Sequence, residues 1–289
     1  MRKQIFADLS ILMVVIVWGY TFVAIKNALE TITPFNFIFV RFTISFLLIS
    51  LIFYGKFKSL KWRTVKSGTV VGVFLFLAYA FQTAGLKYTT ASNAGFITGF
   101  SVVLVPDFSS LLLKKKPSPE STIGVVMAAS GLFLLSYGGV SSVNRGDILV
   151  FFCALSVAFH ILSVGYYVKK HDSVQLTIVQ IGTVAFLAFL SDLFAGEISM
   201  PAGEVVWSAI LICAVFATVG AYLVQNIMQR FTSPTHTALI FSGEPVFAGI
   251  FGYFLLGEKL GVMALAGCFF ILAGMVVSEV KVTGRGDEM

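Results

Sequence analysis

The sequence predicts an all-α integral membrane protein with ten transmembrane helices, arranged as two inverted repeats of five helices. Three observations lead to this prediction. Of the 289 residues, 57% are hydrophobic and only 12% are charged, and the mean hydropathy is +0.93, whereas a soluble domain of this size needs far more polar surface. Apolar runs of about 20 residues, the length that crosses a bilayer, follow one another along the chain. Landmark residues of the first half recur in the second half.

Short polar breaks that contain glycine or proline separate the apolar runs, for example Thr33-Pro34, Pro117-Ser118-Pro119 and Ser233-Pro234. The runs do not alternate apolar and polar residues at every second position, which excludes spans of a β-barrel. The first run is too long for a signal peptide and no A-x-A-like site closes it, so it is counted as a span. The predicted spans are 8–28, 34–54, 67–86, 92–113, 120–139, 147–168, 173–195, 204–226, 235–256 and 260–280.

The positive charges orient these spans. If the N-terminus lies in the cytoplasm, fifteen of the 20 lysines and arginines fall in inside segments, four fall in outside loops, and Arg41 lies within a span. Lysine and arginine accumulate on the cytoplasmic side of membrane proteins, so both termini are expected inside the cell, with the chain in the cytoplasmic (inner) membrane. Lys114, Lys115 and Lys116 then form a cytoplasmic stop after span 4. The basic residues form no single patch, and no nucleic-acid partner is expected.

The two halves of the chain share landmarks. Asp8 and Asp147 each begin a span, at an offset of 139 residues, and at the same offset Arg41 corresponds to Gln180. Later in the chain the offset becomes 143. The pairs at this offset are Thr89-Thr90 with Thr232-Ser233, Val102 with Pro245, Gly124 with Gly267, and Gly131 with Gly274.

We therefore divide the chain into a first repeat at 1–141, with spans 1–5, and a second repeat at 142–289, with spans 6–10. Five spans per repeat is an odd number, so the second repeat must be inverted relative to the first. Inverted repeats are common in secondary transporters, where they allow one site to open to either side. A duplication that only enlarges the bundle is the alternative, because channels and some membrane enzymes also carry repeats.

Ordered motifs also resemble a known family. Span 1 contains WGYTFVAIK and span 2 contains PFNFIFVRF. Spans 3 and 4 contain GLKYTTASNAGFITGFSVVLVP, and span 9 lies within FTSPTHTALIFSGEPVFAGIFGYFLLGEKL. Over residues 8–280 the chain resembles the EamA branch of the drug/metabolite transporter superfamily. The resemblance implies two inverted five-helix repeats around a central cavity lined mainly by spans 1, 3, 4, 6, 8 and 9. It also implies transport of small metabolites, often amino acids or drug-like compounds and frequently as export.

Four ionisable residues lie inside predicted spans, where such groups are costly and usually mark a pathway. Glu244, before Pro245 in span 9, is a candidate ligand for a substrate or proton, or a structural carboxylate. Arg41 is a candidate for gating or for holding an anionic group, or it pairs with a carboxylate or extends outward. Asp107 is a candidate proton carrier, although similar sequences carry an apolar residue there. His160 is either a substrate donor or a satisfied packing residue.

Aromatic and polar residues in other spans complete the predicted substrate site. Tyr79 and Gln82 are three residues apart and share a helix face, as do Tyr222 and Gln225. Two such pairs in related spans favour a cavity with aromatic walls, although tyrosine and tryptophan also anchor helices at membrane interfaces. The further candidates are Trp18, Tyr20, Asn93 and Phe96.

We predict a secondary active transporter that works by alternating access. An intramembrane enzyme is the first alternative, but the chain has no HExxH, no Walker A motif and no Ser/His/Asp constellation. A channel is the second, but no filter-like loop or charged ring is visible. The three cysteines have no metal-binding spacing, so no metal or cofactor is expected. The expected partners are a small-molecule substrate, the lipid bilayer and a second copy of the chain.

Overall fold

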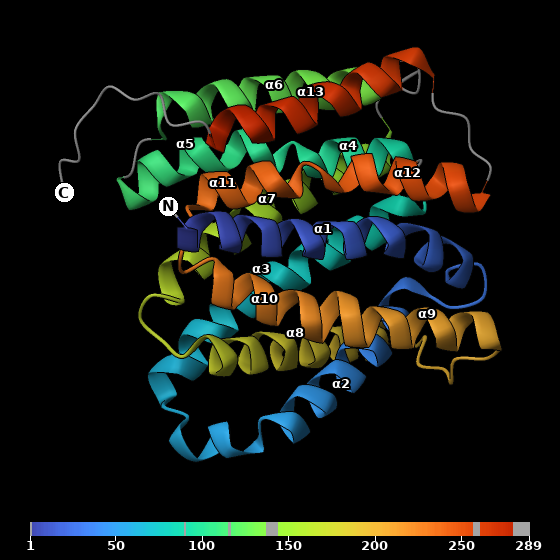
Figure 1. The fold of residues 1–289 in the computed structure, drawn as a ribbon. Coiled ribbons are helices and arrows are strands. Elements are labelled where there is room, and N and C mark those ends of the chain that lie inside the picture. The colour runs from blue at the N-terminus through green and yellow to red at the C-terminus, as the bar shows by residue number, and fades with distance from the viewer. Residues whose placement is uncertain (1, 90, 115–116, 137–143, 257–260, 280–289) are drawn as a thin grey trace.

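The computed structural model describes residues 2–89, 91–114, 117–136, 144–256 and 261–279, and within these ranges the regular elements are all helices (Figure 1). The first half of the chain forms α1 (Arg2–Ala28), α2 (Pro34–Ile52), the 3₁₀ helix η1 (Tyr54–Ser59), α3 (Trp62–Leu86), α4 (Ala91–Gly99), α5 (Ser101–Leu113) and α6 (Pro119–Ser136). The second half forms α7 (Arg145–Tyr167), α8 (Ser173–Ala195), α9 (Glu204–Ala214), the π-helical turn η2 (Val215–Gly220), α10 (Ala221–Met228), α11 (Pro234–Phe241), α12 (Glu244–Leu256) and α13 (Val262–Glu279).

The predicted apolar runs coincide with these helices. Within the described residues, seven helices are long and apolar enough to cross a membrane, and they include α1, α2, α3, α7 and α8. Three further apolar helical segments are shorter, at Ile97–Leu112, Pro119–Leu134 and Val262–Ser278. The protein is therefore an all-helical, multi-pass membrane protein. The charges predicted to end span 4 lie partly at 115–116, outside the described residues.

Two of the predicted spans are broken in the middle. Span 4 consists of α4 and α5, which are separated at Phe100, and span 9 consists of α11 and α12, which are separated at Ser242 and Gly243. The sequence predicts a kink at Pro245, but the break lies just before it. Pro245 is the second residue of α12, where a missing N–H interrupts no helical hydrogen bond.

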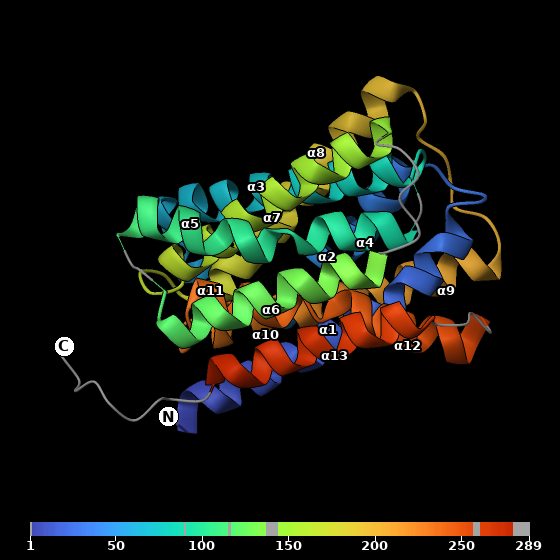
Figure 2. The ribbon, with the colours of Figure 1, turned by 90° about the horizontal axis from the view of Figure 1, so that it is seen from above.

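Helices α6 and α13 form an antiparallel pair along one side of the bundle in both views (Figures 1 and 2). Glycines allow this close approach: a Cβ atom at Gly124 would lie 2.7 Å from the carbonyl oxygen of Gly274, and one at Gly131 would lie 2.6 Å from that of Gly267. These four glycines therefore pack predicted spans 5 and 10 together.

The remaining contacts occur in related sets. Helix α3 packs on α7 and α8, while the segment from α9 to α10 packs on α1 and α2. Similarly, α4 and α5 pack on α7, while α11 and α12 pack on α1. Each of these contacts therefore has a counterpart, in which the matching helix of the other half makes the same kind of contact with the first half.

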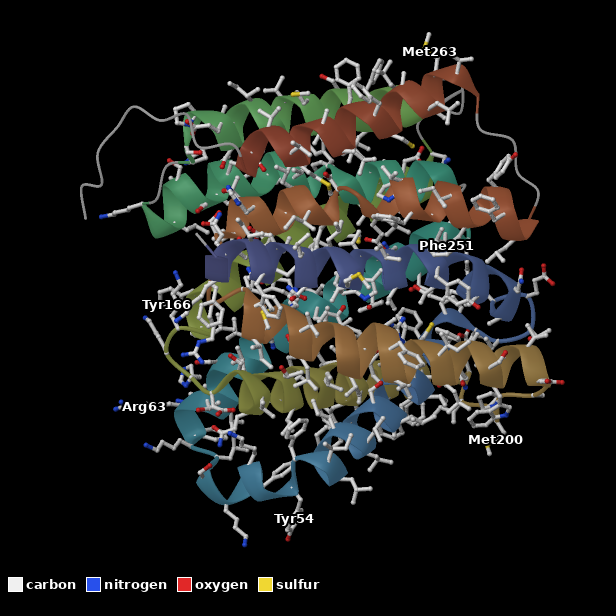
Figure 3. The ribbon with its side chains drawn as sticks, in the orientation of Figure 1. Tyr54, Arg63, Tyr166, Met200, Phe251 and Met263 are labelled. Atoms are coloured by element: carbon white, nitrogen blue, oxygen red, sulfur yellow. The ribbon has the colours of Figure 1, made fainter. Side chains whose placement is uncertain are left out.

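Labelled side chains mark the two ends of the bundle, and apolar side chains are exposed on its outside. Arg63 and Tyr166 lie at the end where α1 begins, and Met200 and Met263 lie at the opposite end (Figure 3). Large apolar side chains such as Leu51 and Phe194 are exposed on the outside, as expected for a surface that contacts lipid.

Candidate functional site

A cavity of about 500 Å³ lies inside the bundle. Residues from α1, α2, α3, α4, α7, α10, α11 and α12 line it, and it extends from Glu244 and His160 to Glu30. Because Glu30 is an exposed residue that follows α1, the cavity opens at the end of the bundle where α1 ends. Seven of the predicted site residues lie on its wall: Trp18, Arg41, Tyr79, Gln82, His160, Tyr222 and Glu244.

Arg41 is almost completely buried, with 2% of its surface exposed. Its Nε donates to Thr218 Oγ1 at 2.8 Å, and its Nη2 donates to Tyr79 Oη at 3.1 Å and to the carbonyl oxygen of Ala217 at 3.3 Å. These partners are all neutral, so Arg41 neither pairs with a carboxylate nor extends to the surface. No hydrogen bond within the described residues involves Nη1, whose two N–H groups remain available on the cavity side.

The π-helical turn η2 provides part of this arrangement. A π turn widens the helix and changes which carbonyl groups are available to other donors, which is why such turns are frequent at functional sites. The carbonyl oxygen of Ala217 accepts from Trp18 Nε1 at 2.9 Å as well as from Arg41. Trp18 also packs on Phe241 and Tyr222. The turn therefore holds both the Trp18 ring and the Arg41 guanidinium in position.

A chain of polar groups crosses the bundle at this level. Tyr79 Oη and Tyr222 Oη lie 2.9 Å apart in a hydrogen bond. The ring of Tyr222 packs edge-on against His160, whose Nε2 lies 3.2 Å from Gln180 Oε1. The structure therefore connects Arg41 to Gln180, the residue that corresponds to it in the predicted repeat.

Glu244 is the first residue of α12, directly after the break in span 9. Its carboxylate lines the cavity and forms no hydrogen bond or ion pair with any described residue. A carboxylate is stabilised at a helix N-terminus, where backbone N–H groups are unpaired and the helix dipole is positive. The break therefore positions an unpaired acid on the cavity wall.

Three predicted site residues lie away from the cavity wall. Tyr20 packs on Phe251, with ring centroids 5.6 Å apart. Gln225 is completely buried and donates to Gln229. Asp107 is exposed on α5 and is not part of the wall. Two others, Asn93 and Phe96, belong to α4, but their side chains lie outside the part of the chain that the structure describes.

The sequence analysis missed three polar residues that line the cavity, Thr98, Ser101 and Cys153. Gln82 Nε2 donates to Thr98 Oγ1 at 3.2 Å, and Thr98 Oγ1 lies 3.8 Å from Cys153 Sγ. Ser101, at the start of α5, also lines the cavity. No sequence signal marks these residues, because threonine, serine and cysteine are common in membrane helices and the contacts join three different spans. Among the described residues, no cluster of His, Cys, Asp or Glu could hold a metal ion.

Comparisons with known proteins identify the family of the chain and its fold. The profile of the EamA-like transporter family matches residues 5–137 and 144–279. An uncharacterized transporter of Archaeoglobus fulgidus is 37% identical over 97% of this chain and 88% of its own length. The uncharacterized transporter YcxC of Bacillus subtilis is 26% identical over 91% of this chain and 89% of its own. A protein of known crystal structure shares the fold, with a TM-score of 0.79 over 94% of this chain and 96% of that one, at 18% identity.

Proposed function

Because the chain belongs to the EamA-like transporter family, we propose that it is a secondary active transporter that moves a small metabolite across the cytoplasmic membrane by alternating access. In this proposal ten spans form two inverted repeats, at 1–141 and 142–289. With both termini inside the cell, the cavity in this conformation faces the outside. Export is the proposed direction.

The paired packing of the helices supports the repeat. Contacts of α3 and α4–α5 with the second half have counterparts in which α9–α10 and α11–α12 contact the first half. The glycine contacts show the same exchange, because Gly124 meets Gly274 while Gly267 meets Gly131. A two-fold relation between the halves produces such reciprocal contacts. An inverted repeat is the arrangement with five spans per half that gives this relation within a membrane.

The observation that carries the substrate proposal is a guanidinium and a carboxyl group in one cavity, neither of them in an ion pair with a described residue. Arg41 keeps an unpaired Nη1, and Glu244 has no partner among the described residues. Trp18, Tyr222 and Phe241 supply apolar walls. These groups suit a small zwitterion with an apolar side chain, such as an amino acid, or an amphiphilic drug-like amine.

Purified protein in liposomes, tested for counterflow of labelled amino acids and small amines with and without an imposed pH gradient, tests this function. We expect saturable counterflow of at least one compound. Glu244→Gln should raise its half-saturating concentration by about tenfold or more, because a lost charge-assisted hydrogen bond costs about 1.5–3 kcal/mol. Glu204→Gln, on the exposed first turn of α9, removes a carboxylate away from the cavity and should leave counterflow unchanged.

Other outcomes would point to the alternatives. Flux that does not saturate and needs no exchange partner would indicate a channel. Chemical conversion of a labelled compound would indicate an intramembrane enzyme. Saturable counterflow that is equally strong in Glu244→Gln would keep the transporter but contradict the proposed substrate site.

A further inference from the structure

Two rows of first-half residues form much of the cavity wall. Within each row the spacing is three or four residues, which places the row on one helix face. The row on α1 is Trp18, Thr21, Ile25 and Leu29. The row that starts on α3 and ends just after it is Tyr79, Gln82, Leu86 and Thr89.

Second-half residues at the offsets found in the sequence form two matching rows. An offset of 139 gives Val157, His160, Val164 and Val168 on and just after α7, and an offset of 143 gives Tyr222, Gln225, Gln229 and Thr232 on and after α10. The first members of these rows, Val157, His160 and Tyr222, also line the cavity. The other five, Val164, Val168, Gln225, Gln229 and Thr232, do not line it and are between 0% and 6% exposed.

We call these five residues the closed rows, and three of them, Gln225, Gln229 and Thr232, are polar although they are buried. Gln225 Nε2 donates to Gln229 Oε1 at 3.2 Å, and Gln229 Nε2 donates to the carbonyl oxygen of Ile161 at 2.7 Å. Gln225 Oε1 and Thr232 Oγ1 are buried and have no hydrogen-bond partner among the described residues. Leaving such a group unpaired costs about 1–3 kcal/mol, and a substrate group that pairs with it in another conformation would offset this cost.

The helices pack closely at Gly165, whereas Thr232 also lines a separate pocket near Gln4, at the end of the bundle where α1 begins. A Cβ atom at Gly165 of α7 would lie 2.9 Å from Pro234 Cγ and 3.3 Å from Gln229 Nε2. The glycine therefore lets α7 approach the region between α10 and α11 closely. At the offset of 139, the corresponding residue of the first half is Lys26 of α1.

We propose that the closed rows are the second half of the substrate path, which lines the cavity when the protein opens at the end where α1 begins. In that state Gln225 and Gln229 bind an uncharged hydrogen-bonding group of the substrate, such as an amide or a hydroxyl. This inference rests on the alternating access proposed above. On this proposal the inner half of the path is more polar than the outer half, because Gln229 occupies the position that corresponds to Leu86.

Cysteine labelling in membrane vesicles of both orientations tests the proposal without a known substrate. The full chain receives one cysteine at a time in a closed row, Gln229→Cys or Thr232→Cys, or at the matched position of an open row, Leu86→Cys or Thr89→Cys. A membrane-impermeant thiol reagent is applied to one face, and labelled peptides are read by mass spectrometry. Ile178→Cys, buried in the core of α8 outside both rows, is the control, and the parent chain gives the background of its native cysteines.

We expect Gln229→Cys and Thr232→Cys to react from the face where α1 begins, and Leu86→Cys and Thr89→Cys from the opposite face. Leu86→Trp should hold the cavity open at the end where α1 ends, and so lower the population of the state that opens at the end where α1 begins. Labelling at Thr232→Cys should then be about tenfold slower, because its rate follows the population of that second state. Size-exclusion chromatography checks that each variant is folded.

Two results would overturn the proposal in distinguishable ways. If both closed-row cysteines react no faster than Ile178→Cys while Leu86→Cys reacts normally, the closed rows are structural and the cavity proposal stands. If Leu86→Cys reacts from both faces at once, the path is a pore, and alternating access fails together with this inference.

Discussion

At the scale of single residues, the most costly arrangement is the complete burial of Arg41 among neutral partners. Each N–H group of a buried guanidinium needs an acceptor, and Thr218 Oγ1 supplies one at 2.8 Å. Thr218→Val keeps the shape and removes this acceptor, so we expect it to lower the free energy of unfolding by about 1–3 kcal/mol. Thermal unfolding in detergent measures the effect.

The control for this prediction is Thr183→Val. Thr183 Oγ1 donates only to the carbonyl oxygen of Val179 in its own helix, so its loss should cost less than about 1 kcal/mol. Equal effects of the two substitutions would show that the hydroxyl of Thr218 does not support Arg41.

The two intramembrane carboxylates of the sequence prediction differ in their surroundings. Glu244 faces the cavity, whereas Asp107 is exposed on the outer side of α5. A group that couples protons to substrate movement must be reached from the substrate path. We therefore expect Glu244→Gln to abolish uptake driven by a pH gradient and Asp107→Asn to retain it, as measured in liposomes. Loss of the gradient response in Asp107→Asn alone would restore Asp107 as the proton carrier.

The sequence predicted which residues line the cavity better than it predicted the hydrogen bonds between them. Charged and aromatic residues inside apolar runs are conspicuous because their burial is costly, which is why Arg41, Glu244 and Trp18 were identified. The hydrogen bond from Gln82 to Thr98 joins two spans, and no periodicity within one span signals it. Gln225 was predicted in the cavity because it resembles Gln82 in spacing, but it is buried away from the cavity wall.

At the scale of helices, the sequence predicted positions well and interruptions poorly. Apolar length and loop residues locate a span because the bilayer imposes both. The break at Phe100 has no proline or glycine pair at its centre, and the π turn η2 arises where tertiary contacts satisfy the freed carbonyl groups. Such interruptions depend on neighbouring helices, so one chain segment does not encode them alone.

The glycine contact between α6 and α13 gives a prediction at this scale. A methyl group at Gly131 or Gly274 would lie 2.6 or 2.7 Å from a backbone carbonyl oxygen of the other helix. We expect Gly131→Ala and Gly274→Ala each to destabilise the protein by about 1–3 kcal/mol, because the helices must separate. The repeat relates these two positions, so the effects should be similar in size.

Gly261→Ala is the matched control for the glycine contact, because a Cβ atom there meets no other atom within 4 Å. Its effect on the melting temperature in detergent should be small, within about 0.5 kcal/mol. A large loss for Gly131→Ala with none for Gly274→Ala would argue against equivalent contacts in the two repeats.

At the scale of the whole molecule, the number of membrane crossings determines which loops share a side. Among the described residues, seven helices can cross a membrane by length and composition, and the shorter segments include Ile97–Leu112 and Pro119–Leu134. A short apolar helix can still cross if the bilayer thins locally or if flanking residues reach the interface. In span 4 the preceding turns of α4 add further length. Ten crossings therefore require that Val262–Ser278 crosses as well, and that Ile97–Leu112 and Pro119–Leu134 cross in opposite directions.

Exposed positions flanking these segments test the ten-span arrangement. Single cysteines replace Tyr88 after α3, Ser118 before α6 and Arg145 at the start of α7, all of which are exposed. Because two crossings separate Tyr88 from Arg145, we expect Tyr88→Cys and Arg145→Cys to react with an impermeant reagent from outside the cell. Ser118→Cys should react only from the cytoplasmic side, since one crossing separates it from each of the others. Reaction of all three from the same face would mean that neither short segment crosses. The first half would then have only three spans, and two repeats of five spans would be excluded.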